Sequence, residues 1–151
     1  MRRGWEVGKD GRDTNLHQLV PYRYDTRRYG ITLPVLLMLG DRVAEFKAKL
    51  GTGASLCVFA RLHGEELGLD IEHGSRQEIA TVMGNFVAYG HPVRLSVLDL
   101  EFDSTVYFAA ETGFNRNVLG RQGWLDRIKL GLVDYEGKLY LSDYTEATEA
   151  G

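Results

Sequence analysis

Short segments in which apolar and polar side chains alternate recur along most of this chain, and they limit the fold more than any other feature. From residue 43 to residue 50, small or apolar side chains alternate with charged ones, so that one face of an extended strand is apolar and the other polar. Such segments are spaced by about 8 to 12 residues and separated by Gly-containing turns, a pattern typical of a β-barrel or β-sandwich. The strands expected are 30–39, 43–50, the two arms of a hairpin over 78–90, 93–100, 104–110, 129–133 and 138–141.

The segments between these strands predict turns and little helix. Turns are expected at Gly40-Asp41, at Met83-Gly84-Asn85, at 101–103 and at 135–137. Residues 59–67 favour a short helix or turn, weakened by two glycines. Residues 117–128 contain the one convincing amphipathic turn of helix, so we predict a mostly-β fold with one short C-terminal helix.

The chain length of 151 residues fits one domain with one packed core. Residues 1–28 are expected to form a polar, weakly basic N-terminal arm, since the first 30 residues carry seven Arg and Lys against four Asp and Glu. The domain itself is expected to span 29–142. Residues 143–151 are polar and are expected to form a frayed tail.

Charge and hydropathy exclude several classes of function. The formal net charge of −3 argues against a nucleic-acid-binding protein. The longest apolar run, 33–39, is interrupted by Pro34 and is too short to cross a bilayer. The first residues contain no apolar run that would serve as a signal peptide, so we expect a cytoplasmic protein without a membrane segment.

The cysteine and histidine content gives no sign of a metal site or a cofactor. Cys57 is the single cysteine, so it cannot form an internal disulfide, and its apolar neighbours predict a small buried side chain rather than a nucleophile. The four histidines are scattered without an i, i+4 pair, so no metal site is expected. Gly51 and Gly53 are spaced as in a dinucleotide-binding turn, but Leu56 stands at the third glycine position and no βαβ pattern surrounds it.

Two motifs, read together, point to one family. The first is an apolar strand that runs into Leu50-Gly51-Thr52-Gly53-Ala54-Ser55, and the second is Asn117-Val118-Leu119-Gly120-Arg121, with a Gly-tipped hairpin between them. This arrangement resembles the retropepsin-like aspartic peptidases over about residues 30–142. In that family an apolar strand runs into Asp-Thr/Ser-Gly-Ala, a flap hairpin follows, and two apolar residues plus Gly-Arg/Asp open a C-terminal helix. The resemblance implies a closed β-barrel, the single lobe of an acid protease.

The resemblance also implies a homodimer in which each subunit gives one catalytic aspartate. Two carboxylates about 3 Å apart share one proton, so that one activates a water molecule as a base while the other acts as an acid. Gly51 stands where the family has this aspartate, and glycine has no side chain to hold the proton or the water. The chain as written is therefore expected to be inactive, through either an engineered replacement or a natural loss.

The resemblance assigns further roles position by position. Thr52 would reach across the dimer to the partner's backbone, although a turn threonine bonded to its own backbone is the alternative. Gly53 would admit the substrate backbone, with Ala54 and Ser55 lining the same cleft. The flap tip would comprise Met83, Gly84 and Asn85, and the structural second motif Val118, Leu119, Gly120 and Arg121. Arg121 lacks the acidic partner that many members carry at the position of Ser55.

Two functional interpretations follow from these residues. The first is a homodimeric aspartic endopeptidase that hydrolyses peptide or protein substrates without a cofactor, inactivated here at Gly51. The second is a non-catalytic peptide-binding or dimerisation module on the same fold. A more distant third is a β-barrel that serves only as a scaffold for the basic arm.

Overall fold

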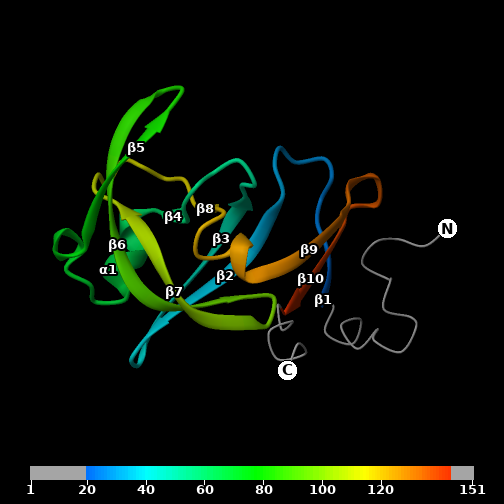
Figure 1. Cartoon of the computed structure of the whole chain (residues 1–151), viewed down its shortest axis with the longest axis horizontal. Coiled ribbons are helices and arrows are strands. Elements are labelled where there is room, and N and C mark those ends of the chain that lie inside the picture. The colour runs from blue at the N-terminus through cyan, green and yellow to red at the C-terminus, as the bar shows by residue number, and fades with distance from the viewer. Residues whose placement is uncertain (1–19, 144–151) are drawn as a thin grey trace.

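The computed structural model describes residues 20–143, and the expected arm over 1–19 and tail over 144–151 lie outside the described residues. Two sheets make up this part of the chain (Figure 1). The larger has the strand order β2-β3-β8-β4-β7-β6-β5, and a further pairing of β2 with β6 closes it into a barrel. The smaller sheet, at the right in Figure 1, has the order β1-β10-β9. The predicted mostly-β, single-lobe fold is confirmed.

The larger sheet contains β2 (Thr32–Leu39), β3 (Arg42–Leu50), β4 (Val58–Phe59), β5 (Ser75–Thr81), β6 (Gly84–Val97), β7 (Leu100–Ala109) and β8 (Val118–Leu119). The smaller contains β1 (Val20–Arg23), β9 (Ile128–Val133) and β10 (Lys138–Asp143). The helical segments are α1 (Arg61–Glu66) and the 3-10 helices η3 (Ile71–His73), η4 (Leu125–Arg127) and η5 (Asp134–Glu136). Residues 20–23, assigned from the sequence to the N-terminal arm, thus form a strand that pairs with β10.

The alternation in β3 produces the burial that the sequence predicts. Ala44 and Ala48 are buried while the charged residues between them are exposed. The other core residues come from alternate positions of β2, β6 and β7 and from the segments around β4, β8 and β10: Leu33, Val35, Leu37, Phe59, Val93, Leu95, Val97, Val106, Phe108, Leu119, Trp124, Leu139 and Leu141. Removing each large side chain of this kind from water contributes about 1.5–3 kcal/mol.

Two turns lie elsewhere than the sequence suggested. The β5–β6 turn is Val82-Met83, and Asn85 lies in β6 opposite Ala80, so the prediction of Asn85 in the turn is wrong. The β6–β7 turn is Leu98-Asp99, at φ +49° and +70°, and not residues 101–103. Two consecutive positive φ values match the twist of a two-residue hairpin, and they leave Val97 opposite Leu100 with both strands in register.

The helical content is smaller than the sequence predicted around residues 117–128. There β8 pairs with β3 and β4, and the predicted C-terminal helix is present as the three-residue 3-10 helix η4. The one α-helix within residues 20–143 is α1, which falls in the 59–67 segment. None of the described helices is long and apolar enough to cross a membrane.

Candidate active site

Strand pairing between β3 and β8 positions the loop that contains Gly51. β8 lies parallel to β3, with Lys49 opposite Val118 and Leu50 opposite Leu119. The Gly51 N–H donates to Leu119 O at 2.9 Å, which carries the pairing one residue past the end of the strand. The first motif and the second motif are therefore adjacent in space.

A tight turn follows the strand at once. The Ala54 N–H donates to Gly51 O at 3.0 Å, which closes a turn over residues 51–54. The Arg121 N–H donates to Ala54 O and the Gln122 N–H donates to Ser55 O, each at 2.9 Å. The turn is thus fixed on both sides by backbone bonds to the second motif, and no carboxylate in residues 20–143 makes a hydrogen bond to it.

Gly120 lies where the two motifs come closest. A Cβ on this residue would contact Leu56 O, and would lie 2.6 Å from the Leu56 carbonyl carbon and 2.9 Å from Ala54 O. These atoms belong to the backbone, so no side-chain rotation relieves the contact. Only glycine fits here, and this explains why the second motif contains one.

The space beside Gly51 is also occupied. A Cβ at residue 51 would lie 2.6 Å from Val118 Cγ1, 3.4 Å from Ala54 Cβ and 3.5 Å from Leu119 O. The closest of these atoms is a side-chain methyl group, so an aspartate at this position requires Val118 to change its rotamer.

Thr52 and Gly53 lie at the exposed tip of the turn. The Thr52 hydroxyl makes no hydrogen bond within the described part of the chain, so the alternative of a turn threonine bonded to its own backbone is not observed. A Cβ on Gly53 would meet no atom of residues 20–143 within 4 Å, and the φ of Gly53 is not positive. Neither packing against these residues nor backbone conformation therefore requires a glycine at position 53.

Two side chains that the sequence analysis did not assign hold this region together. Asn117 accepts the Ala60 N–H at Oδ1 (2.8 Å) and donates from Nδ2 to Lys47 O (3.3 Å), so it ties β3 to the end of β4. Cys57 is buried, and its Sγ accepts the Gly120 N–H at 3.3 Å. Burial raises the pKa of the Cys57 thiol to about 11, consistent with the predicted small buried side chain. The position of Asn117 at the start of the second motif was the one available signal for its role.

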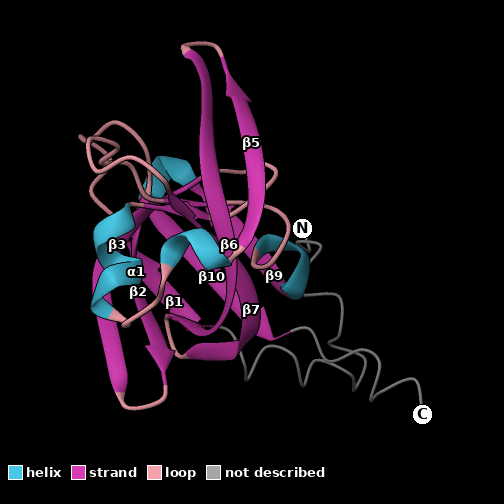
Figure 2. Cartoon of the chain, turned by 90° about the vertical axis from the view of Figure 1, so that its left-hand side faces the viewer, coloured by secondary structure: helices cyan, strands magenta, loops and turns pink. Residues whose placement is uncertain are grey.

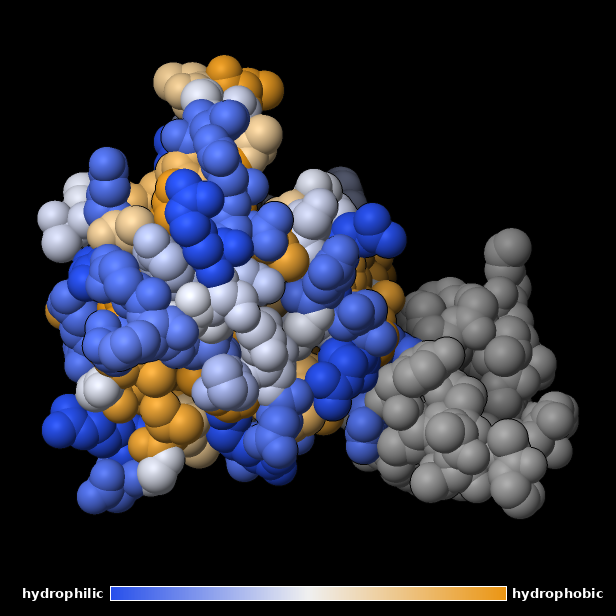
Figure 3. Space-filling model, turned by 60° about the vertical axis from the view of Figure 1, so that its left-hand side comes forward, coloured by the Kyte–Doolittle hydropathy of each residue, from blue (hydrophilic) through white to orange (hydrophobic). Residues whose placement is uncertain are grey.

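The β5–β6 hairpin projects from the body of the barrel (Figures 1 and 2). Its tip is hydrophobic and exposed (Figure 3): Val82 is fully exposed and Met83 is 84% exposed. Thr81 organises the turn, since its Oγ1 donates to Gly84 O at 2.7 Å and accepts the Met83 N–H at 3.1 Å. Lower on the hairpin, the ring of Phe86 stacks on Phe114 with centroids 4.5 Å apart, a contact that the sequence did not reveal.

The other polar residues predicted for the site lie at the protein surface. Ser55 and Arg121 are exposed, and Arg121 forms no ion pair with another residue in 20–143. Asn85 is exposed and donates from Nδ2 to Glu78 Oε2 at 3.4 Å across the hairpin. No three His, Cys, Asp or Glu side chains of the described residues come together as metal ligands.

A separate hollow of about 440 Å³ lies against β7, and it does not include the turn at 51–54. Two of its polar side chains bond to the protein itself: Ser104 Oγ donates to Gly123 O at 2.6 Å, and Arg127 Nη1 donates to Asp103 O at 3.0 Å. We therefore place the candidate site at the turn and the hairpin and not in this hollow.

Comparison with solved structures agrees with the fold. A retropepsin-like aspartic protease from Rickettsia conorii superposes with a TM-score of 0.58 at 16% identity, covering 83% of this chain and 91% of that one. EIAV protease in complex with the inhibitor HBY-793 gives a TM-score of 0.48 at 22% identity, covering 62% of this chain and 84% of that one. No protein-family profile and no curated protein sequence matches the chain. The chain has the retropepsin-like fold.

Proposed function

We propose that this chain is one half of a peptide-binding cleft of the retropepsin type, which is completed by a second copy and, as written, holds an extended peptide without hydrolysing it. The proposal rests chiefly on the turn at 51–54, which is fixed at the barrel centre by bonds from the second motif. By resemblance, the turn corresponds to the catalytic loop of an aspartic endopeptidase, with Gly51 at the position of the reactive carboxylate.

Thr52 and Gly53 support a cleft completed from outside this subunit. The Thr52 hydroxyl is exposed and lacks a partner in the described residues, so it is free to donate to or accept from a second copy. The open space at Gly53 lets another backbone approach the turn without meeting a side chain. No contact within residues 20–143 requires either feature.

The projecting hairpin supports a flap. An extended peptide lying between the turn and the hairpin would gain backbone hydrogen bonds, as an added strand does. When the hairpin tip closes over the bound peptide, the exposed side chains of Val82 and Met83 would be removed from water, which is favourable for apolar groups.

One observation supports a module that binds without catalysis as a second candidate function. Val118 Cγ1 occupies the space beside Gly51, so the surrounding packing is adapted to glycine. On either interpretation we expect the chain as written to leave denatured casein intact at mildly acidic pH. Cleavage above the level of a buffer control would exclude the aspartic mechanism for this site.

The flap assignment predicts a difference in hydrogen exchange within the single strand β6. Residues 93–97 are paired on both sides, with β2 and β7 for most of their length, whereas residues 84–86 are paired only with β5. An isolated two-stranded ribbon is marginally stable, so amides over 79–87 should exchange quickly and those over 93–97 slowly. Adding a pool of unmodified decapeptides should slow amide exchange over 79–87 and leave amide exchange over 93–97 unchanged. Slow exchange there in the free protein would contradict the flap.

A further inference from the structure

The two segments that contain the motifs carry basic side chains and no acidic ones. Residues 46–55 include Lys47 and Lys49, residues 114–122 include Arg116 and Arg121, and neither range contains Asp or Glu. The chain as a whole has a formal net charge of −3, so these segments differ in sign from the rest of the protein. Because β8 pairs with β3, the four cations belong to segments that are bonded to one another around the turn at 51–54.

The two lysines lie on the face of β3 to which residue 51 also belongs. Lys47 and Lys49 occupy alternate positions of the strand, and residue 51 is the next position in that series. Val118 is paired with Lys49 and shares this face, since its Cγ1 lies 2.6 Å from the position of a Cβ at residue 51. Two residues of a strand span about 7 Å, so the ammonium group of Lys49 is within reach of a peptide that crosses the turn.

The two arginines lie on the second motif and directly before it. The Arg121 N–H donates to Ala54 O at 2.9 Å, which fixes the backbone of this arginine beside the turn. Arg116 directly precedes Asn117, whose carbonyl oxygen accepts the Lys49 N–H at 2.8 Å. Basic side chains therefore flank the turn from both of the segments that form the candidate site.

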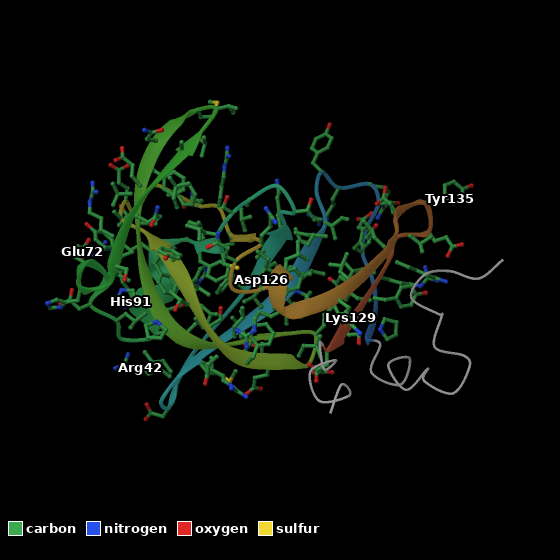
Figure 4. The ribbon with its side chains drawn as sticks, in the orientation of Figure 1. Arg42, Glu72, His91, Asp126, Lys129 and Tyr135 are labelled. Atoms are coloured by element: carbon green, nitrogen blue, oxygen red, sulfur yellow. The ribbon has the colours of Figure 1, made fainter. Side chains whose placement is uncertain are left out.

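These four cations are not neutralised within residues 20–143. All four side chains are exposed, and none makes a hydrogen bond or an ion pair with another described residue. The carboxylates nearest to them along the chain are Glu45, Glu111 and Asp126. Asp126, labelled in Figure 4, accepts the Gly123 N–H at 3.1 Å instead. Like charges that gather without counter-charges create a positive potential, which attracts an anionic partner.

We propose that the cleft selects extended peptides with Asp or Glu side chains, which bind to the basic cluster formed by Lys47, Lys49, Arg116 and Arg121. This inference rests on the proposed function, to which it adds the class of peptide. Guanidinium and ammonium groups form charge-assisted hydrogen bonds with carboxylates, and these are stronger than hydrogen bonds between neutral groups.

The aromatic residues of the two segments favour a peptide over single-stranded nucleic acid. Sites for single strands combine a basic groove with aromatic rings on which the bases stack. Here the ring of Phe46 stacks on His63 and the ring of Phe114 stacks on Phe86, and both phenylalanines are half-buried. The basic cluster therefore lacks the open aromatic platform that bases require.

Matched decapeptides with Asp, Asn or Lys at alternate positions test the preference by fluorescence anisotropy. At about 0.01 M salt, where the screening length is about 30 Å, the Asp peptide should bind at least about tenfold more tightly than the Asn peptide, and the Lys peptide should bind most weakly. At about 1 M salt the screening length is about 3 Å, so the preference for Asp should disappear. A preference that survives at this salt concentration would overturn the role of the basic cluster.

Lys49→Gln and Arg121→Gln each remove one charge, one from each segment. Each should lower the ratio of Asp-peptide to Asn-peptide affinity by about twofold or more, within the range of a single exposed ion pair. Both side chains are exposed, so the circular dichroism spectrum should not change. Arg42→Gln is the matched control, because Arg42 lies at the far end of β3 from the turn (Figure 4) and the ratio should be unchanged.

The outcomes distinguish this inference from the proposed function. Equal affinities of the Asp and Asn peptides at low salt would overturn the acidic preference while the proposed cleft stands. Failure of all three peptides to bind would overturn both. An oligouridylate that binds more tightly than the Asp peptide would overturn the choice of a peptide as the partner of the basic cluster.

Discussion

Gly51→Asp should convert this chain into a peptidase with activity at least about 10²-fold above that of the unchanged protein, the lower range of a general acid–base contribution. The turn at 51–54 is fixed by backbone bonds from the second motif, so a new carboxylate would extend from a preformed support. In a symmetric dimer the substitution places two carboxylates at the axis at once. They would share a proton, and casein hydrolysis should be greatest at mildly acidic pH and be blocked by a pepstatin-type inhibitor.

The pH dependence of Gly51→Asp follows from that shared proton. The reactive pair needs one ionised and one protonated carboxyl group, so activity should fall at low pH, where both are protonated, and at high pH, where both are ionised. Gly51→Asn is the matched control, since it has nearly the same size and no titratable group. It should remain inactive throughout the pH range.

Val118 determines whether one substitution is enough. Its Cγ1 lies 2.6 Å from the position of a Cβ at residue 51, and β-branched side chains have few χ1 alternatives. The double variant G51D/V118A removes this contact and should hydrolyse casein at least as fast as G51D. If both variants fold, dimerise and leave casein intact, the non-catalytic binding module is the better interpretation.

The strands of this fold follow from the sequence because their signal is local. Alternation over 43–50 marks the buried face of β3, and one face of β7 is buried at Ser104, Val106 and Phe108 in the same way. The β6–β7 turn was misplaced because its residues, Leu98 and Asp99, lack the Asn-Gly signature of a two-residue hairpin. The position of this turn is instead set by the register of β6 and β7, which keeps their apolar side chains on one face.

The candidate site follows from the sequence only in part because its geometry is non-local. Nothing local to 50–55 or to 117–121 indicates that β8 lies parallel to β3, and the sequence analysis did not predict that pairing. The side-chain bonds of Asn117 and the stacking of Phe86 on Phe114 join segments far apart in the chain. The amphipathic pattern over 117–128 predicted a helix, whereas strand pairing at β8 leaves room for only one 3-10 turn.

Gly120→Ala should destabilise the folded chain by about 3 kcal/mol or more, the upper range for overpacking a close-packed site. The new methyl group would collide with the backbone of Leu56 and Ala54, and avoiding it would break the bonds that hold the turn at 51–54. Urea denaturation followed by circular dichroism measures the free energy of unfolding. A loss smaller than about 0.5 kcal/mol, the range of ordinary surface substitutions, would show that the two motifs are not packed as described.

Gly53→Ala is the matched comparison, because it adds the same methyl group to a neighbouring glycine with open space around it. Its free energy of unfolding should stay within about 0.5 kcal/mol of the unchanged protein. In the proposed cleft, however, the methyl group would lie where a peptide backbone approaches the turn, so the decapeptide pool should no longer protect residues 79–87 from exchange. Gly113→Ala, also in open space but outside the turn, should change neither quantity. Undiminished protection in G53A would place the bound peptide somewhere other than against Gly53, whatever the outcome at Gly120.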